Sequence, residues 1–309
     1  LAVARRADCA KEMDAIERFG ARLLLSADED YPEMLASLPD KPPLLVVKGD
    51  AALFRERTIA IIGARNASTA GRKLARLFAE GVGRAGVVVV SGLARGIDGA
   101  AHEAALRTGT IAVVAGGIDV VYPPEHARLQ AAIGEQGLIV SERPFGSEPQ
   151  ARDFPRRNRI VSGLSIAVVV VEAAAKSGTR ITADFALEQG RDVFAAPGSP
   201  LDPRCNGSNR LIREGALLVE TAEDILDGIA GPRRRILSMS GGATFEEDAA
   251  AATPAFRARV LDALSFAPMH RDEIIRDLEA PPGLVADALL DLVLSGEAEE
   301  HPGGRFARV

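Results

Sequence analysis

The chain has 309 residues, long enough for one large domain and a small one, and its 47% hydrophobic and 26% charged content is that of an ordinary globular protein. A net charge of −6 excludes a general electrostatic affinity for DNA, so any nucleic-acid site must be a local patch. Two distant cysteines and four scattered histidines indicate neither a disulfide framework nor a metal site. The sequence has no signal-peptide pattern and no apolar run of about 18 residues, so we expect a cytoplasmic protein with no membrane segment.

The N-terminal region is divided into two short pieces. Met13, Ile16 and Phe19 have helical spacing, so we expect a small helical element in residues 1–25. Prolines break the stretch that follows, which we interpret as an extension leading into a main domain of residues 26–230.

Six short, nearly uncharged apolar runs dominate the main domain, and helical stretches separate most of them. Runs that are apolar on both faces indicate buried parallel strands. Because they alternate with helices, we predict an α/β fold with a doubly wound, extended Rossmann-like and mostly parallel sheet. The runs are residues 59–62, 87–90, 111–114, 138–140, 166–171 and 193–196.

A stretch rich in Pro, Gly and Ala, residues 231–254, ends this alternation, and we interpret it as a linker. Three short amphipathic helices and two extended pieces follow in residues 255–309, which is the plan of a small winged helix. The helices are expected at residues 256–266, 271–279 and 282–295, and the extended pieces within residues 297–309.

The predicted winged helix is acidic, with six basic and ten acidic residues. Its third helix carries Asp287 and Asp291 and has no Lys or Arg in residues 283–295. Negative charge opposes the electrostatic attraction that supplies nearly all non-specific affinity for DNA, so we expect this domain to dock a protein or to self-associate. Only Arg305 and Arg308, in the wing, could contact phosphates.

Three turns follow predicted strands. The first lacks the dinucleotide and P-loop fingerprints but places Arg65 between a strand end and a helix start, where anions bind. An ion pair within the fold would explain Arg65 equally well. The second turn, residues 91–98, offers glycines and backbone N–H groups to a ligand, and Asp98 suits a helix cap. The alternative, a catalytic triad of Ser91, Asp98 and His102, lacks a nucleophile-elbow context.

The third turn, residues 177–179, follows the strand that ends near Glu172. Because the carboxyl ends of parallel strands meet at one edge of a sheet, we expect all three turns to converge on one ligand site. Glu172 is then either a catalytic carboxylate or a partner for Asn158 and Arg159, and we favour the second interpretation.

Positive charge gathers around one aromatic ring in this acidic chain. From Arg152 to Arg180 the net charge is +4, and the run begins beside Phe154. Bases of a single strand stack on rings while phosphates pair with guanidinium groups, so this composition predicts a single-stranded nucleic-acid site. Otherwise Phe154 is a core residue and the arginines are ordinary surface charges.

Short motifs occur along residues 26–227 in a fixed order. They are Tyr31-Pro32, Gly63-Ala64-Arg65, Ser91-Gly92-Leu93-Ala94, Gly96-Ile97-Asp98, Ala101-His102, Tyr122-Pro123, Ser141-Glu142, Phe154-Pro155, Arg157-Asn158-Arg159, Ser177-Gly178-Thr179 and Pro197-Gly198. Together they resemble the DNA-processing protein A family, also called Smf. Residues 255–309 resemble the winged-helix appendage that many members carry.

The resemblance implies a cytoplasmic bacterial protein that binds and protects single-stranded DNA and loads the RecA recombinase, notably in natural transformation. It also implies a non-enzymatic, extended Rossmann domain that forms a homodimer and needs no nucleotide cofactor. Together with the basic cluster, it predicts a nucleic-acid site made of Arg65, Ser91, Gly92, Arg152, Phe154, Arg156, Arg157, Asn158, Arg159, Lys176, Ser177, Gly178 and Thr179.

Residues 209–219 are more apolar than one helix-on-sheet contact requires, and in the family resembled this region helps to form the dimer. The apolar side chains are therefore expected either at a dimer interface or simply in the core. They are Leu211, Ile212, Leu217 and Leu218.

A nucleotide-acting enzyme of the phosphoribohydrolase (LOG) type is the alternative function. The Rossmann core of such enzymes also ends a strand in a Gly-Gly-x-Gly-Thr turn near a carboxylate. Here the turn reads Lys176-Ser177-Gly178-Thr179, without the leading glycine pair or the Glu pair that follows, so we favour the DNA-binding protein.

Overall fold

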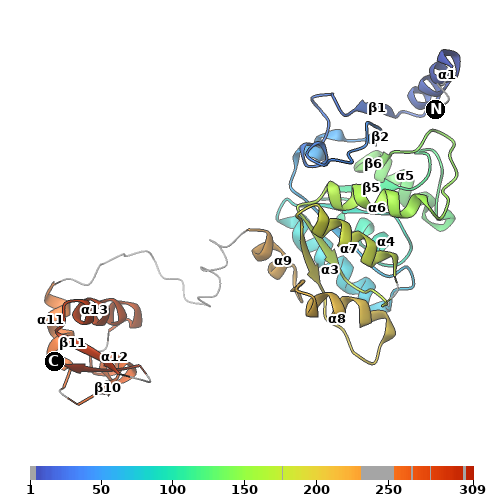
Figure 1. The fold of residues 1–309 in the computed structure, drawn as a ribbon. Coiled ribbons are helices and arrows are strands. Elements are labelled where there is room, and N and C mark those ends of the chain that lie inside the picture. Colours follow the sequence, from blue (N-terminus) through green and yellow to red (C-terminus); the bar gives the residue numbers. More distant parts are fainter. Residues whose placement is uncertain (1–4, 176, 231–253, 266, 279, 302–303) are drawn as a thin grey trace. The chain divides into compact units, whose positions relative to one another are not determined.

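Figure 1 shows a computed structural model of the chain, which describes residues 5–175, 177–230, 254–265, 267–278, 280–301 and 304–309. The chain divides into two compact units, residues 1–239 and residues 240–309, and each has its own hydrophobic core. Two sequence predictions lie outside the described residues, namely Lys176 in the basic cluster and the linker except for its last residue, Pro254.

The first unit is built on a sheet that, in the described part of the chain, has nine strands in the order β1-β2-β6-β5-β4-β3-β7-β8-β9. The six apolar runs correspond to β3 to β8, which pair in parallel with one another, so the predicted doubly wound and mostly parallel sheet is confirmed. The strands are β1 (Arg22–Leu25), β2 (Leu44–Gly49), β3 (Thr58–Ile62), β4 (Val88–Ser91), β5 (Thr110–Val114), β6 (Leu138–Ser141), β7 (Ala167–Val170), β8 (Asp192–Ala195) and β9 (Leu217–Leu218).

Helices cover both faces of this sheet, because successive strand residues point to opposite sides. Ala60 and Ile62 face a core under α2, α6, α7 and α8, whereas Ile59 and Ile61 face a core under α3, α4 and α9. The helices are α1 (Arg6–Arg18), α2 (Glu33–Ala36), α3 (Thr69–Arg84), α4 (Ile97–Ala105), α5 (Ala127–Gln136), α6 (Asp153–Gly163), α7 (Gly178–Glu188), α8 (Asn206–Arg213) and α9 (Ala222–Ile229), with 3-10 turns at Ala51–Arg55, Pro124–His126 and Pro203–Cys205.

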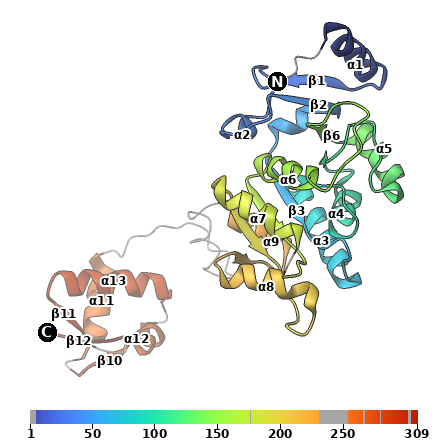
Figure 2. The same ribbon diagram turned by 45° about the vertical axis from the view of Figure 1, so that its right-hand side comes forward.

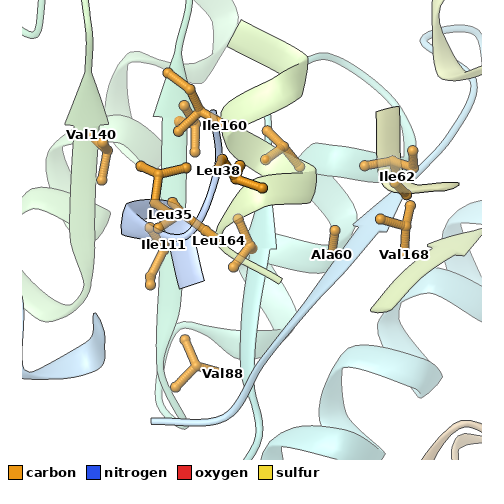
Figure 3. Close-up of a cluster of buried hydrophobic side chains, with 14 of the residues drawn as sticks. Leu35, Leu38, Ala60, Ile62, Val88, Ile111, Val140, Ile160, Leu164 and Val168 are labelled. Carbon is orange, nitrogen blue, oxygen red and sulfur yellow. The ribbon is translucent and has the colours of Figure 1, made fainter. Parts of the chain in front are cut away.

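The core under α6 fixes the helix that carries the basic cluster. Ile160 of α6 and Leu164, which caps its C-terminus, pack beside Leu35 above the strands, and all three side chains are buried (Figure 3). Each such side chain contributes about 1.5–3 kcal/mol on burial. With its C-terminal half anchored in this way, α6 holds Phe154 and Arg157 at the carboxyl ends of β3 to β5.

The N-terminal region differs from the sequence prediction. The helix ends at Arg18, and Arg22–Leu25 forms β1, which pairs antiparallel with β2, itself antiparallel to β6 (Figure 2). The domain boundary that we predicted after residue 25 therefore falls between β1 and the rest of the sheet to which β1 belongs. Leu24 and Leu45 are buried in the same core as the parallel strands, and this burial stabilises an edge strand too short to be evident in the sequence.

Residues 209–219 form the end of α8 and the edge strand β9. Leu211 is only 4% exposed and belongs to the core, and Ile212 and Leu217 pack partly against the cores on the two faces. Leu218 is 50% exposed on the edge strand. Of the four residues predicted for a dimer interface, Leu211 is thus a core residue, and Leu218 is the most accessible.

The second unit has the predicted winged-helix plan. Three helices surround a core that includes Val260, Ile274 and Leu289, and the described residues form a small antiparallel sheet in the order β10-β12-β11. The elements are α11 (Pro254–Ala263), β10 (Met269–His270), α12 (Arg271–Leu278), α13 (Pro282–Leu294), β11 (Ala298–His301) and β12 (Arg305–Arg308).

The outer face of α13 is acidic and apolar. Asp287, Leu290, Asp291 and Leu294 are all exposed on this helix.

None of the helices in the described ranges of the whole chain combines the length and the apolar character needed to cross a lipid bilayer.

Candidate nucleic-acid interface

A cleft of about 720 Å³ opens at the carboxyl ends of β3 and β7. The strand order reverses there, and open α/β sheets bind their ligands at such switch points. The turns after β3, β4 and β7 all contribute to its walls, as does the N-terminal half of α6. The predicted site residues that line the cleft are Arg65, Gly92, Phe154, Arg157, Asn158, Ser177, Gly178 and Thr179.

Arg157 lies at the base of the cleft and is only 6% exposed. Its Nη1 donates to the carbonyl oxygen of Val113 at 2.7 Å and to that of Gly92. Burial lowers the pKa of Arg157 to about 10, while the carboxylate of Asp98 opposes this shift, so the guanidinium is charged at neutral pH. Arg157 therefore ties α6 to the ends of β4 and β5 and places a fixed positive charge under the cleft.

Position 92 must be glycine for Arg157 to occupy this place. A Cβ on Gly92 would lie 1.9 Å from Nη1 of Arg157. The sequence predicted that this glycine admits a ligand backbone, but the Arg157 side chain uses the space.

The same turn is fixed by Asp98, whose carboxylate accepts from the N–H groups of Gly92 at 3.2 Å and Ala94 at 3.3 Å. Burial raises the pKa of Asp98. Since the N-cap of α4 is Gly96, Asp98 holds the turn and does not cap the helix.

The alternative catalytic triad does not form, because its members bond to other groups. Ser91 donates its hydroxyl to the carbonyl oxygen of Ile61 at 2.7 Å. Nδ1 of His102 lies 2.7 Å from Oγ1 of Thr110, and burial lowers the pKa of His102 to about 3. Ser91 is fully buried, so its side chain is not available to DNA, which differs from its predicted place in the site.

An aromatic and cationic surface forms one wall of the cleft. The guanidinium carbon of Arg65 lies 4.7 Å from the centroid of the Phe154 ring, within the range of a cation–π contact. No acidic partner pairs with Arg65 among the described residues. The ion-pair interpretation of Arg65 is therefore not supported, and its charge remains available to an anion.

Two helix N-termini border the cleft and differ in electrostatics. The N-cap of α3 is Ser68, and the Glu172 carboxylate accepts from both its N–H, at 2.9 Å, and its hydroxyl. Glu172 is thus not the partner of Asn158 and Arg159, because it occupies the anion position at the N-terminus of α3. The first turn of α7 has no side-chain cap, and Ser177 to Thr179 line the cleft there. Positive helix-dipole charge therefore faces the cleft from α7.

The other predicted arginines lie outside the cleft. Arg159 pairs with Glu142 and donates to the carbonyl oxygen of Asp40 at 2.9 Å, so it is held within the fold. Together with Arg156 it lines a separate hollow of about 450 Å³ on the other side of α6. Arg152 is exposed just before α6 and lines neither space.

Sequence reasoning missed three residues near the cleft. Arg204, from the turn before α8, and Asn66 both line it, and the ring of Tyr122 lies 5.6 Å from that of Phe154, centroid to centroid. Tyr122-Pro123 was evident as a motif, but nothing in the sequence connected it to Phe154, which lies far along the chain. Arg204 stands in a separate turn beside Asp202, to which it donates at 2.7 Å, and no pattern distinguished it from a surface ion pair.

Comparison with known proteins places this chain in one family. The family model described as DNA recombination-mediator protein A matches residues 22–230, and the one described as DprA winged helix domain matches residues 246–304. The chain belongs to the DNA recombination-mediator protein A family. The resemblance found in the motifs is thereby confirmed.

Proteins described as Smf or DNA processing protein A are similar to most of this chain. Protein Smf of Escherichia coli strain K12 is 39% identical over 300 residues, covering 94% of this chain and 78% of that protein. The X-ray structure of DNA processing protein A from Streptococcus pneumoniae shares 42% identity with a TM-score of 0.68, covering 72% of this chain and 77% of that one. A structure of DNA processing protein A from Helicobacter pylori, which addresses its single-stranded DNA binding mode, shares 29% identity with a TM-score of 0.63 and covers 68% of this chain and 95% of that one.

Proposed function

We propose that this family member acts in the cytoplasm as a non-enzymatic protein that binds single-stranded DNA in the cleft at the switch point. The observation that carries the proposal is the contact between Arg65 and Phe154 beside the uncapped N-terminus of α7. A strand needs a ring for its bases and positive charge for its phosphates, and this wall supplies both.

The cleft is suited to bind single strands of any base sequence. The Asn158 side chain, which could read a base edge, accepts from Nε of Arg157 at 3.1 Å and lies 3.4 Å from the carbonyl oxygen of Gly178. Its amide is therefore engaged within the protein. Stacking and phosphate contacts tolerate every base, so we expect little base preference.

Strong but salt-sensitive binding of single strands is the expected result of titrating labelled oligothymidylate by fluorescence anisotropy. The logarithm of the affinity should fall with the logarithm of salt by about 0.7 for each phosphate neutralised. A duplex of the same length should bind more weakly. Salt-independent affinity or tighter binding of duplex would contradict the proposal, and release of free base from nucleoside monophosphates would favour the LOG-type enzyme.

We further propose that the bound strand is protected and passed to RecA recombinase, as in natural transformation, which rests on membership of a recombination-mediator family. Strands covered by single-strand binding protein should then support RecA ATP hydrolysis after a shorter lag when this protein is present. An unchanged lag with intact DNA binding would refute RecA loading and leave the binding site in place.

We propose a homodimer that uses the edge of the sheet at β9. Leu218 is the half-exposed apolar residue there, and the edge strand offers unpaired backbone groups. Leu218→Asp should give monomers by sedimentation velocity, because a buried unpaired charge is costly at an interface. Leu187→Asp, at a 60% exposed leucine on α7, is the matched control. Dimers that persist with Leu218→Asp would place the interface elsewhere.

Deleting residues 232–309 should change the affinity for single-stranded DNA by less than about tenfold, or 1.4 kcal/mol. The exposed face of α13 presents Asp287 and Asp291 with Leu290 and Leu294, which suits a protein partner and repels phosphates. Anisotropy measures the affinity, and sedimentation checks the oligomeric state. A larger loss without a change of oligomeric state would show that the winged helix binds DNA.

A further inference from the structure

Tyr122 presents an exposed aromatic ring next to Phe154 to which the proposed function gives no role. It stands in the segment between β5 and α5 and is 43% exposed. Its ring centroid lies 5.6 Å from that of Phe154, with an angle of 53° between the ring planes. Within the described residues Tyr122 makes no hydrogen bond and no ring contact other than this one, so its hydroxyl and the exposed part of its ring are available to a ligand.

The surface of the cleft continues past Phe154 to Tyr122. Phe154 and Arg65 line both the cleft and a small hollow beyond it, and that hollow is also lined by Tyr122 and Arg95. The hollow has a volume of about 40 Å³, which is room for water molecules but too small for a base. A base that reaches Tyr122 would therefore lie on the solvent-exposed surface of this side chain.

Arg95 supplies positive charge along this path. It forms an ion pair with Glu125, with 2.9 Å between Nε and Oε1, and both side chains are largely exposed. Pairs exposed to this degree contribute little to stability, so a phosphate can compete for the guanidinium at low cost. The path from Phe154 to Tyr122 thus offers both kinds of contact that a strand requires.

We propose that Tyr122 is a second stacking platform, which binds the base adjacent to the one on Phe154; this rests on the proposed function of the cleft. Because the two rings are inclined by 53°, two bases that stack on them cannot also stack on each other. The strand is therefore splayed at this step. A base-paired or strongly self-stacked strand cannot adopt that shape, so the pair of rings selects flexible single strands.

The composition of the chain provides a direct readout of this stacking. The chain has two tyrosines and no tryptophan. Tyr31 is 7% exposed, and its hydroxyl donates to the carbonyl oxygen of Pro42 at 2.7 Å, so its emission provides a constant background. A base that stacks on Tyr122 should quench the remaining tyrosine emission.

The test titrates the full chain with dye-labelled oligothymidylate and follows dye anisotropy and tyrosine emission in the same samples. Anisotropy reports binding, and emission should fall in parallel with it. Tyr122→Phe, which retains only Tyr31, supplies the correction for absorption by DNA and should show no further quenching. Saturable anisotropy with a fractional loss of emission in the parent no larger than that in Tyr122→Phe would overturn the stacking role while leaving the proposed function intact. Absence of binding by anisotropy would overturn both.

Affinities give a second readout. Tyr122→Ala should weaken binding of oligothymidylate by about 5- to 150-fold, the usual effect of one lost base stack, and Tyr122→Phe should restore most of it. Val121→Ala, at the exposed neighbouring residue, is the matched control and should bind like the parent. Equal affinities of folded Tyr122→Ala and the parent would overturn the inference. If Tyr122→Ala does not fold, the emission of the parent chain decides.

Discussion

Replacing Arg157 with alanine is expected to lower the free energy of unfolding by about 1.5–3 kcal/mol, because it removes the charged donor to the carbonyl oxygens of Gly92 and Val113. The change also removes the positive charge that opposes the rise in the pKa of Asp98. Urea unfolding followed by circular dichroism measures the loss, and an unchanged m-value would show that the native and unfolded states keep their compactness.

Two further variants separate charge from position. Arg156→Ala removes the same charge from the preceding residue, which is exposed and without a partner among the described residues. This variant should change the free energy of unfolding by less than about 0.5 kcal/mol. Arg157→Lys keeps the charge but cannot reproduce both carbonyl contacts, and should have an intermediate effect. If Arg157→Ala is as stable as Arg156→Ala but binds DNA poorly, Arg157 acts on the ligand and not on the fold.

Replacing Phe154 with alanine is expected to weaken single-strand binding by about 1–3 kcal/mol, because one base loses its stacking surface. Arg65→Ala should cost about 1.5–3 kcal/mol through the loss of a charged contact to phosphate and should reduce the salt slope. Anisotropy titrations of each variant and of the double variant measure these effects. The 4.7 Å contact between the two side chains predicts that their losses are not additive.

The two controls for this pair either keep the aromatic ring or remove the same charge outside the cleft. Phe154→Tyr retains the stacking surface and should bind nearly as tightly as the parent. Arg180→Ala removes one charge from α7 outside the cleft, where Arg180 pairs with Glu214 at 2.8 Å, and should have little effect. Parental affinity in folded Phe154→Ala and Arg65→Ala would show that the site lies elsewhere.

The parallel strands could be predicted because they are apolar on both faces, so each appears in the sequence as an uninterrupted run. β1 and β9 could not, since they lie at the edges of the sheet, where one side is open and a short strand carries little pattern. β2 lies between β1 and β6, but the prolines that precede it led us to expect an irregular extension there. β9 has only two residues, and β1 has four. Only their pairing partners, distant in sequence, define them.

The convergence of the three turns on one cleft was predictable for a similar reason, since strands that run in parallel bring their following turns to one edge. The different positions and contacts of the arginines in α6 could not be predicted. Consecutive helical residues point about 100° apart, so Arg156, Arg157 and Arg159 of α6 cannot face the same way. The structure directs Arg157 under the cleft and the other two to the opposite side. Which one is buried depends on the carbonyl groups of β4 and β5, which the local sequence does not reveal.

The carboxylate of Glu172 at the start of α3 has a consequence for what this Rossmann-like sheet can recognise. In dinucleotide-binding relatives of the fold the helix after the first strand receives a pyrophosphate. Here the carboxylate of Glu172 already occupies the N-terminus of that helix. A Cβ on Gly71 would lie 2.4 Å from the carboxyl carbon of Glu172, so this carboxyl group packs closely against the helix. An incoming phosphate would meet a like charge at α3 and an open helix end at α7. The protein thus closes the position where a compact nucleotide would sit and leaves a neighbouring one where a polymer can pass through.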